Sequence, residues 1–333
     1  MTQLAGGPAA RSRAERTDSS LGARSASFLF NGHPPRRRTL VLIVGALFGF
    51  ALTVVWSAEF VDKTIGGNVA GALLGHPAKD APINGALAGI AFALATGVAG
   101  TFTACNVAVF SAMAPLAGQV QTRRGRLAQL VRPLGWLAVG AVSVSALYGA
   151  VAALAGTGMP QFEQSTGGSG GGFSGRLIQA MVVYGVLGLV MTYLGLAAAG
   201  LVRDPLAGLT ERFPHAPMLF MGALVGAFQL GRPYGLFRQL FRDAAESHNP
   251  LYGAVAFGLQ AVGNIVVVSL LFLLVAGLFG DRLGRWLTAR PSRTSALMAA
   301  AFVAAGVFML LYWDVRILAR RDLIWYPMAP WAG

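Results

Sequence analysis

The stretch GVAGTFTACNVAVFSAMAP, residues 97–115, decides how the fold of this chain is interpreted. It lies inside a long apolar run, yet it carries two threonines, an asparagine, a closing proline and the only cysteine of the chain, Cys105. Glycine, proline and polar groups in the middle of a membrane helix kink or interrupt it. The stretch therefore predicts a broken helix within a bilayer.

The composition is that of a membrane protein. Of 333 residues, 55% are hydrophobic and 12% are charged, with a mean hydropathy of +0.60, whereas soluble domains carry about 25% charged residues. The net charge of +13 comes from arginines in short clusters between apolar runs, which indicates positive-inside topology and argues against a nucleic-acid partner. One cysteine excludes an intramolecular disulfide, and four scattered histidines predict no metal site. No cofactor and no conventional enzyme activity are expected.

Seven apolar runs each reach the roughly 20 residues that a helix needs to span a bilayer. They cover residues 39–56, 84–117, 133–155, 176–202, 216–241, 251–280 and 294–314. Because arginine clusters fall in alternate loops, we expect a multi-pass cell-membrane protein with its N-terminus in the cytoplasm and its C-terminus outside.

The two ends of the chain differ from the apolar runs. Residues 1–38 have no apolar periodicity and are expected to form a disordered, basic cytoplasmic tail that ends in PPRRR. The last segment, 315–333, carries Trp325, Tyr326 and Trp331, and we expect it to lie along the membrane interface.

The first apolar run has two interpretations. A basic flank before an apolar run is typical of a cleaved signal peptide, here of the twin-arginine type. However, the bulky Trp56 stands two positions before Ala58, the best-placed small residue for cleavage. We therefore expect residues 39–57 to be retained as an extra N-terminal transmembrane helix.

The other six runs divide into two sets of three helices, which cover residues 84–202 and 216–314. Each set opens with a glycine-rich helix that has a polar interruption, and Gly97 precedes Cys105 by eight positions as Gly226 precedes Tyr234. One opening helix enters from outside and the other from inside, so the sets have opposite topology. The predicted fold is all-α, with seven transmembrane helices: the N-terminal anchor helix and a six-helix core of two inverted three-helix repeats.

Interrupted helices at matching positions of inverted repeats are a pointer to a central binding site, although small residues also recur for helix packing alone. The helix breaks are placed at Gly97, Gly100, Gly231, Pro233 and Gly235.

Over about residues 84–314 the chain resembles the membrane electron carriers related to CcdA and to the transmembrane domain of DsbD. In that family the first helix of each inverted repeat carries a Pro-Cys dipeptide at its break. Here the first dipeptide is Ala104-Cys105 and the second is Pro233-Tyr234. The resemblance implies thiol-disulfide chemistry or cytochrome c biogenesis, a thioredoxin-like partner, and a meeting of both dipeptides near mid-membrane. It also implies that the two-cysteine relay is not intact.

A thiol relay needs one thiolate to attack and a second one to resolve the mixed disulfide. With Tyr234 at the second position, one chain alone cannot complete the relay. Cys105 remains the candidate redox thiol, able to form a mixed disulfide with a partner. The alternative is that Cys105 is a small packing residue in a glycine- and alanine-rich helix.

Arg232 is the second anomaly, because a charge inside a membrane helix costs about 2.5–3.5 kcal/mol. If residues 216–241 form one span, Arg232 lies in its outer half, within reach of the interface. Arg238 and Arg242 follow toward the same outward end, against the positive-inside preference. Their partner is an anion or substrate, a carboxylate such as Asp243 or Glu246, or lipid head groups.

Buried amides complete the candidate site. Gln260 and Asn264 are four residues apart and therefore share one helical face. Hydrogen bonding between helices explains such amides without any ligand. If the two broken helices face each other, a substrate-binding set converges around Cys105. Its members are Asn106, Gln229, Arg232, Tyr234, Gln260 and Asn264.

Three functions remain open from the sequence. The first is a divergent thiol-redox or cytochrome c biogenesis protein. The second is a small-solute transporter on the same scaffold, with Arg232 recruiting an anionic or polar substrate. The third is a non-catalytic subunit of a membrane complex, whose partners are the lipid bilayer and the other subunits.

Overall fold

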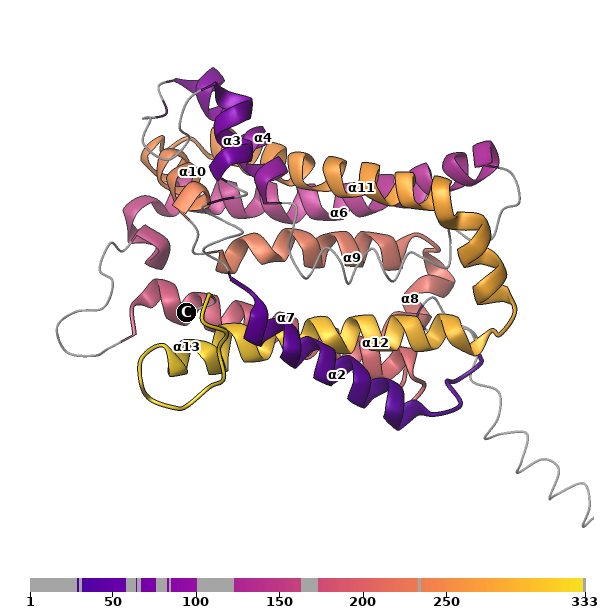
Figure 1. Cartoon of the computed structure of the whole chain (residues 1–333). Coiled ribbons are helices and arrows are strands. Elements are labelled where there is room, and N and C mark those ends of the chain that lie inside the picture. Colours follow the sequence, from indigo (N-terminus) through magenta and orange to yellow (C-terminus); the bar gives the residue numbers. More distant parts are fainter. Residues whose placement is uncertain are drawn as a thin grey trace, which may run out of the picture.

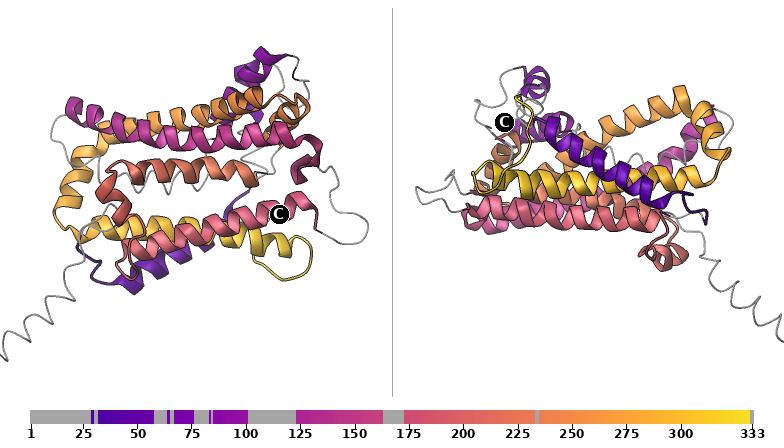
Figure 2. Two further views of the ribbon diagram at one scale, coloured as in Figure 1. Left: turned by 180° about the vertical axis from the view of Figure 1, so that it is seen from behind. Right: turned by 60° about the horizontal axis from the view of Figure 1, so that its bottom comes forward.

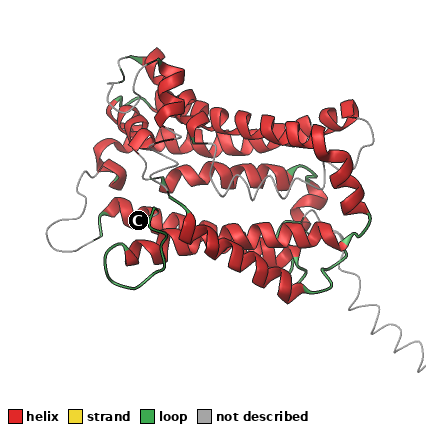
Figure 3. Ribbon diagram, viewed as in Figure 1, coloured by secondary structure: helices red, strands yellow, loops and turns green. Residues whose placement is uncertain are grey.

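The computed structural model describes residues 29, 32–57, 64, 67–75, 83, 85–100, 123–162, 173–232 and 235–331. Within these residues every regular element is a helix (Figure 3). Five helical segments there are long and apolar enough to cross a membrane: 38–55, 130–158, 175–198, 250–288 and 292–319. Two shorter apolar helices cover residues 86–99 and 216–231. The predicted all-helical fold is confirmed for these residues, and the long apolar helices are compatible with a multi-pass membrane protein, while the count of seven spans stays a prediction.

The helices are α2 (Arg38–Val55), α3 (Gly67–Leu74), α4 (Ala86–Ala99), α6 (Arg123–Ala155), η2 (Gly156–Gly158), η3 (Pro160–Phe162), α7 (Gly175–Ala198), α8 (Ala207–Arg212), α9 (Ala216–Ala227), η4 (Phe228–Gly231), α10 (Gly235–Glu246), α11 (Pro250–Thr288), α12 (Ser292–Met309), the π-helix η5 (Leu310–Val315) and α13 (Arg316–Ala319). Local sequence explains the sharp start of α11, because the Asn249 side chain accepts bonds from two backbone N–H groups and Pro250 occupies the first turn.

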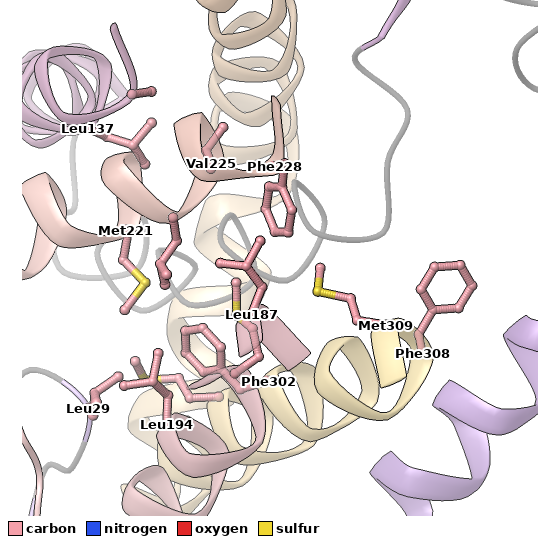
Figure 4. Packing of buried hydrophobic residues seen from close by; sticks show 14 of the residues in the cluster. Leu29, Leu137, Leu187, Leu194, Met221, Val225, Phe228, Phe302, Phe308 and Met309 are labelled. Carbon is pink, nitrogen blue, oxygen red and sulfur yellow. The ribbon is translucent and has the colours of Figure 1, made fainter. Parts of the chain in front are cut away.

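The long helices run along a common direction in two layers, and α9 lies between them (Figures 1 and 2). One layer contains α6 and α11, which pack against each other, and the other contains α7, α12 and α2. Apolar side chains of α9 fill the space between the layers, where Met221 and Phe228 approach Leu187 of α7 and Phe302 of α12 (Figure 4).

The outward-facing side chains of the long helices are apolar. On α2, Leu47 and Phe48 are each 60% exposed, and on α11 Leu270 is 61% exposed. A soluble protein rarely exposes contiguous apolar surface of this kind. These faces fit a hydrocarbon environment.

The two short apolar helices each pack on a long helix of the other predicted set. Helix α4 lies on α11, and α9 lies on α6. Glycines bring the backbones close: a Cβ on Gly263 of α11 would lie 2.6 Å from the Leu94 carbonyl oxygen of α4, and a Cβ on Gly226 of α9 would lie 2.6 Å from the Ala141 oxygen of α6. Both crossings are therefore close backbone contacts between the two predicted sets.

Helix α2 is packed into the bundle by both its face and its end. Gly45 faces α12, where an added Cβ would lie 2.9 Å from the Ala300 oxygen. The last carbonyls of α2 all accept hydrogen bonds from the C-terminal segment: Thr53 and Trp56 from Arg316, Val54 from the Ala329 amide, and Val55 from the Trp331 indole. This packing suits the predicted retained helix.

Several predicted boundaries shift. The arginine-rich stretch 281–288 is the end of α11 and not a loop, and residues 242–246 belong to α10. Within the run 216–241, α9 and η4 end at Gly231 and α10 starts at Gly235, around the break that the sequence analysis placed there. In the C-terminal tail Trp325 is 86% exposed, but Tyr326 is buried against Thr53 of α2.

Candidate functional site

The ends of the two short apolar helices meet inside the bundle. Helix α4 ends with Gly100 as its C-cap, and the helix formed by α9 and η4 ends at Gly231. The Nη2 of Arg232 donates to the Gly100 carbonyl oxygen at 3.1 Å. Because Gly100 has no side chain, the guanidinium fits directly against it; a Cβ there would lie 2.9 Å from the Arg232 Cζ. Arg232 thus joins the two helix ends.

The Arg232 side chain is only 7% exposed and is directed toward the end of α4. That it lies within reach of the membrane interface stays a prediction. The last carbonyls of a helix lack intrahelical partners and carry partial negative charge. The Arg232 guanidinium supplies the missing hydrogen bond and balances the partial negative charge. This explains why a buried cation is tolerated at this point.

The free carbonyls at the end of α9 and η4 are bound by side chains that come from elsewhere. The Nε2 atoms of Gln161 (η3) and Gln179 (α7) both donate to the Leu230 oxygen at 2.8 Å. The Tyr184 hydroxyl donates to the Phe228 oxygen at 3.1 Å. The break is therefore held open by three polar side chains that replace the missing turn of helix.

Gly97 and the amide pair meet where α4 crosses α11. The Gly97 Cα lies over the turn of α11 that carries Gln260 and Asn264, so close that any side chain at Gly97 would strike the Gln260 carbonyl. The side chains of Gln260 and Asn264 are buried, at 1% and 8% exposure. The structure thus brings one predicted break and the two predicted amides together.

Of the other predicted site residues, the structure describes some and does not describe four. Gln229 is 3% exposed in η4, and its carbonyl oxygen accepts the Arg232 amide at 3.3 Å. Gly231 packs on the ring of Tyr184, and Gly235 is the first residue of α10. Four predicted residues lie outside the described part of the chain: Cys105, Asn106, Pro233 and Tyr234.

Several arginines donate hydrogen bonds to backbone carbonyl oxygens near helix ends. Arg38 donates to the Gly200 oxygen just past the end of α7, Arg293 to the Trp286 oxygen near the end of α11, and Arg316 to two carbonyls at the end of α2. A cation at a helix C-terminus typically contributes about 0.3–1 kcal/mol, more where it is partly buried. Four arginines of this basic chain, Arg232 included, thus bind backbone carbonyls near helix ends.

A second polar contact clamps α10 to α11 beside α4. The Tyr252 hydroxyl donates to Asp243 Oδ2, and both groups lie against Gly89, where a Cβ would be 3.3 Å from the carboxylate. Burial raises the pKa of Asp243, the Tyr252 hydrogen bond lowers it, and the charge of Glu246 raises it further. Asp243 therefore accepts the Tyr252 hydrogen bond, and among the described residues it forms no ion pair with an arginine.

Sequence reasoning missed the side chains that cap the break, Gln161, Gln179 and Tyr184. It also missed Asp314, which lies in the π-helix η5 against Gly185, with its Oδ2 buried and without a hydrogen-bond partner. An acidic residue inside an apolar run is a signal that could have found it. No known family model, no curated protein and no solved structure matches this chain.

Proposed function

We propose that the protein carries a small anionic solute across the membrane and binds it where α4 and α9 end. The observation that supports this most is Arg232, a cation only 7% exposed that bridges two interrupted helices within the bundle. Charges at such depth are costly and commonly line the paths of ions and substrates. Interrupted helices that face each other provide the irregular backbone at which carriers bind solutes.

The polar groups beside Arg232 suggest the chemistry of the solute. A guanidinium has five N–H donors in a planar fork, which suits a carboxylate or another oxyanion. The side-chain oxygens of Gln229 and Gln260 are buried and accept no hydrogen bond. A solute with an acidic group for Arg232 and a hydroxyl or amino donor for Gln229 or Gln260 would satisfy Arg232 and one of the two amides.

The scaffold proposed for this function is the seven-helix, inverted-repeat fold of the CcdA and DsbD type, with the N-terminus in the cytoplasm and the C-terminus outside. The helix packing supports it. If α4, α6 and α7 are matched with α9, α11 and α12, the contact of α4 with α11 corresponds to that of α9 with α6, and α6 contacts α11 as α7 contacts α12. Arg38, at the start of α2, donates to the Gly200 oxygen, and Trp331 of the C-terminal tail donates to the Val55 oxygen at the other end of α2. The two ends of the chain thus bind opposite ends of the bundle.

The experiment is solute flux in liposomes that contain the purified protein, with labelled lactate, acetate, alanine and sulfate tested in parallel. We expect lactate, which has both an acid and a hydroxyl group, to move faster than acetate. Arg232→Gln should abolish this flux, while Arg212→Gln, at an exposed residue of α8, should leave it unchanged. Flux no greater than in empty liposomes, or unchanged flux in Arg232→Gln, would refute the proposal.

A second candidate is thiol redox chemistry at Cys105, favoured by the meeting of the two helix ends. Gly100 precedes Cys105 by five residues and Arg232 precedes Tyr234 by two, so the dipeptides that the family resemblance identifies follow directly from the junction. In this function the Cys105 thiolate attacks a disulfide of a thioredoxin-like partner, forming a mixed disulfide and releasing one partner thiolate. A partner that keeps only one of its two cysteines, activated as the mixed disulfide with 5-thio-2-nitrobenzoate, should be trapped by the wild type with release of the nitrothiobenzoate thiolate, and not by Cys105→Ser.

A further inference from the structure

Helices α10 and α7 both contact the short helix η3, at one end of the bundle (Figure 1), and three arginines lie on these two helices. Arg238 and Arg242 are on α10, and Arg176 is in the first turn of α7. Burial lowers the pKa of Arg238, and the positive charges of Arg176 and Arg242 lower it further. The Arg242 guanidinium also lies 5.8 Å from the ring centroid of Phe162 in η3. Arg238 and Arg242, four residues apart on one face of α10, and the start of α7 thus lie around the same short helix, η3.

Two of these arginines differ from those that cap helix ends. The Nε atoms of Arg238 and Arg242 are buried and have no hydrogen-bond partner. By contrast, Arg232, Arg293 and Arg316 each donate to a carbonyl near the end of a helix. Buried donors without acceptors are costly, so the position favours an acceptor from outside the chain.

The nearby carboxylates do not supply that acceptor. Asp243 accepts the Tyr252 hydroxyl, and Glu246 is exposed. Neither forms an ion pair with Arg238 or Arg242 among the described residues. Of the partners that the sequence left open for these arginines, an anion and a lipid head group remain.

We propose that Arg176, Arg238 and Arg242 form a binding site for a phosphate group. A phosphate carries up to two negative charges and several acceptor oxygens, so it can serve more than one guanidinium fork at once, which a single carboxylate does less well. Helix α7 starts beside the cluster with no side-chain cap at Ser174, and its N-terminal dipole adds to the attraction. The phosphate belongs either to a lipid head group or to a soluble phosphate compound.

The site is independent of the proposed transport, because it lies on α10 and the start of α7 and is tested by equilibrium binding without a solute gradient. In neutral detergent, inorganic phosphate is titrated calorimetrically into the wild type, Arg238→Gln, Arg242→Gln and the exposed control Arg212→Gln. Each cluster variant should weaken phosphate binding by about tenfold or more, and the control should not.

Thermal unfolding separates loss of the site from loss of the fold. Removing one of three repelling charges should raise the unfolding midpoint of Arg238→Gln without phosphate, while phosphate should raise the midpoint of the wild type only. In nanodiscs, phosphatidylglycerol in place of phosphatidylcholine should displace phosphate if the source is a lipid, and leave its binding unchanged if the source is soluble. Absence of binding by both probes, or binding that survives both cluster substitutions, would overturn the proposal.

Discussion

The crossing of α4 over α11 makes a quantitative prediction, because both partners approach through glycine. A Cβ on Gly263 would lie 2.6 Å from the Leu94 carbonyl oxygen, and 3.3 Å from the Gly97 Cα. A comfortable carbon–oxygen contact is about 3.3 Å, so Gly263→Ala must separate the helices by about 0.7 Å. Overpacking of this kind costs about 1–3 kcal/mol.

The same helix offers a matched control at Gly277, where an added Cβ would meet nothing within 4 Å. Both substitutions gain about 0.5–1 kcal/mol of helix preference, so that gain cancels between them. We therefore expect Gly263→Ala to unfold with a free energy about 1–3 kcal/mol lower than Gly277→Ala.

The assay is reversible unfolding in mixed micelles, followed by circular dichroism. Equal stability of the two variants would show that α4 does not lie on α11 as described. Gly226→Ala, whose Cβ would lie 2.6 Å from the Ala141 oxygen, repeats the test at the crossing of α9 and α6 and should give the same sign.

Three further predictions concern the polar contacts. Gly100→Ala should displace the Arg232 guanidinium, whose Cζ would lie 2.9 Å from the new Cβ, and should therefore lower the solute flux, whereas Gly277→Ala, where a Cβ meets nothing within 4 Å, should not; equal flux in the two variants would contradict this. Arg316→Met should lower the free energy of unfolding by about 2–3 kcal/mol, because two hydrogen bonds from a charged group are lost; chemical denaturation that shows no change would contradict this. Asp243→Asn keeps an acceptor for Tyr252 but cannot ionise. Since the pKa of Asp243 is raised in the folded protein, the ionised form lowers stability at high pH and this penalty fades as pH falls toward about 4. Asp243→Asn should therefore have a higher thermal midpoint than the wild type at pH 8 and the same one near pH 4, and a lower midpoint at pH 8 would be contrary to the pKa shift.

Apolar runs and glycines carried most of the information that the sequence held about the fold. Hydrocarbon thickness sets a minimum helix length, so composition alone located the five long helices. The glycine spacing around Gly97 and Gly226 marked two close helix crossings, because only a missing side chain permits backbone contact. Helix ends were harder: α11 continues through charged residues to Thr288, since an arginine-rich turn can remain helical outside the apolar layer.

The candidate site was only partly predictable, for a physical reason. The pairing of Arg232 with Gly100 joins residues 132 positions apart, and no local pattern states which carbonyl a guanidinium will reach. Gln161 and Gln179 were overlooked because a single glutamine has no distinctive spacing, and the role of each depends on an exposed carbonyl from another helix. Arg232 itself was found, since a charge in an apolar run is costly wherever it finally points.

The order of synthesis gives the end of α2 a particular role in biogenesis. Its final carbonyls bind donors that lie about 260 residues later in the chain, such as Arg316, 263 positions after Thr53. At roughly 5–20 residues per second, the first helix waits on the order of 10–50 s for those donors to be made. Until then the carbonyls of its last turn lack these donors, and water must take their place. The first helix to enter the membrane is therefore among the last to be completed, and only a chain translated to its final turns can complete it.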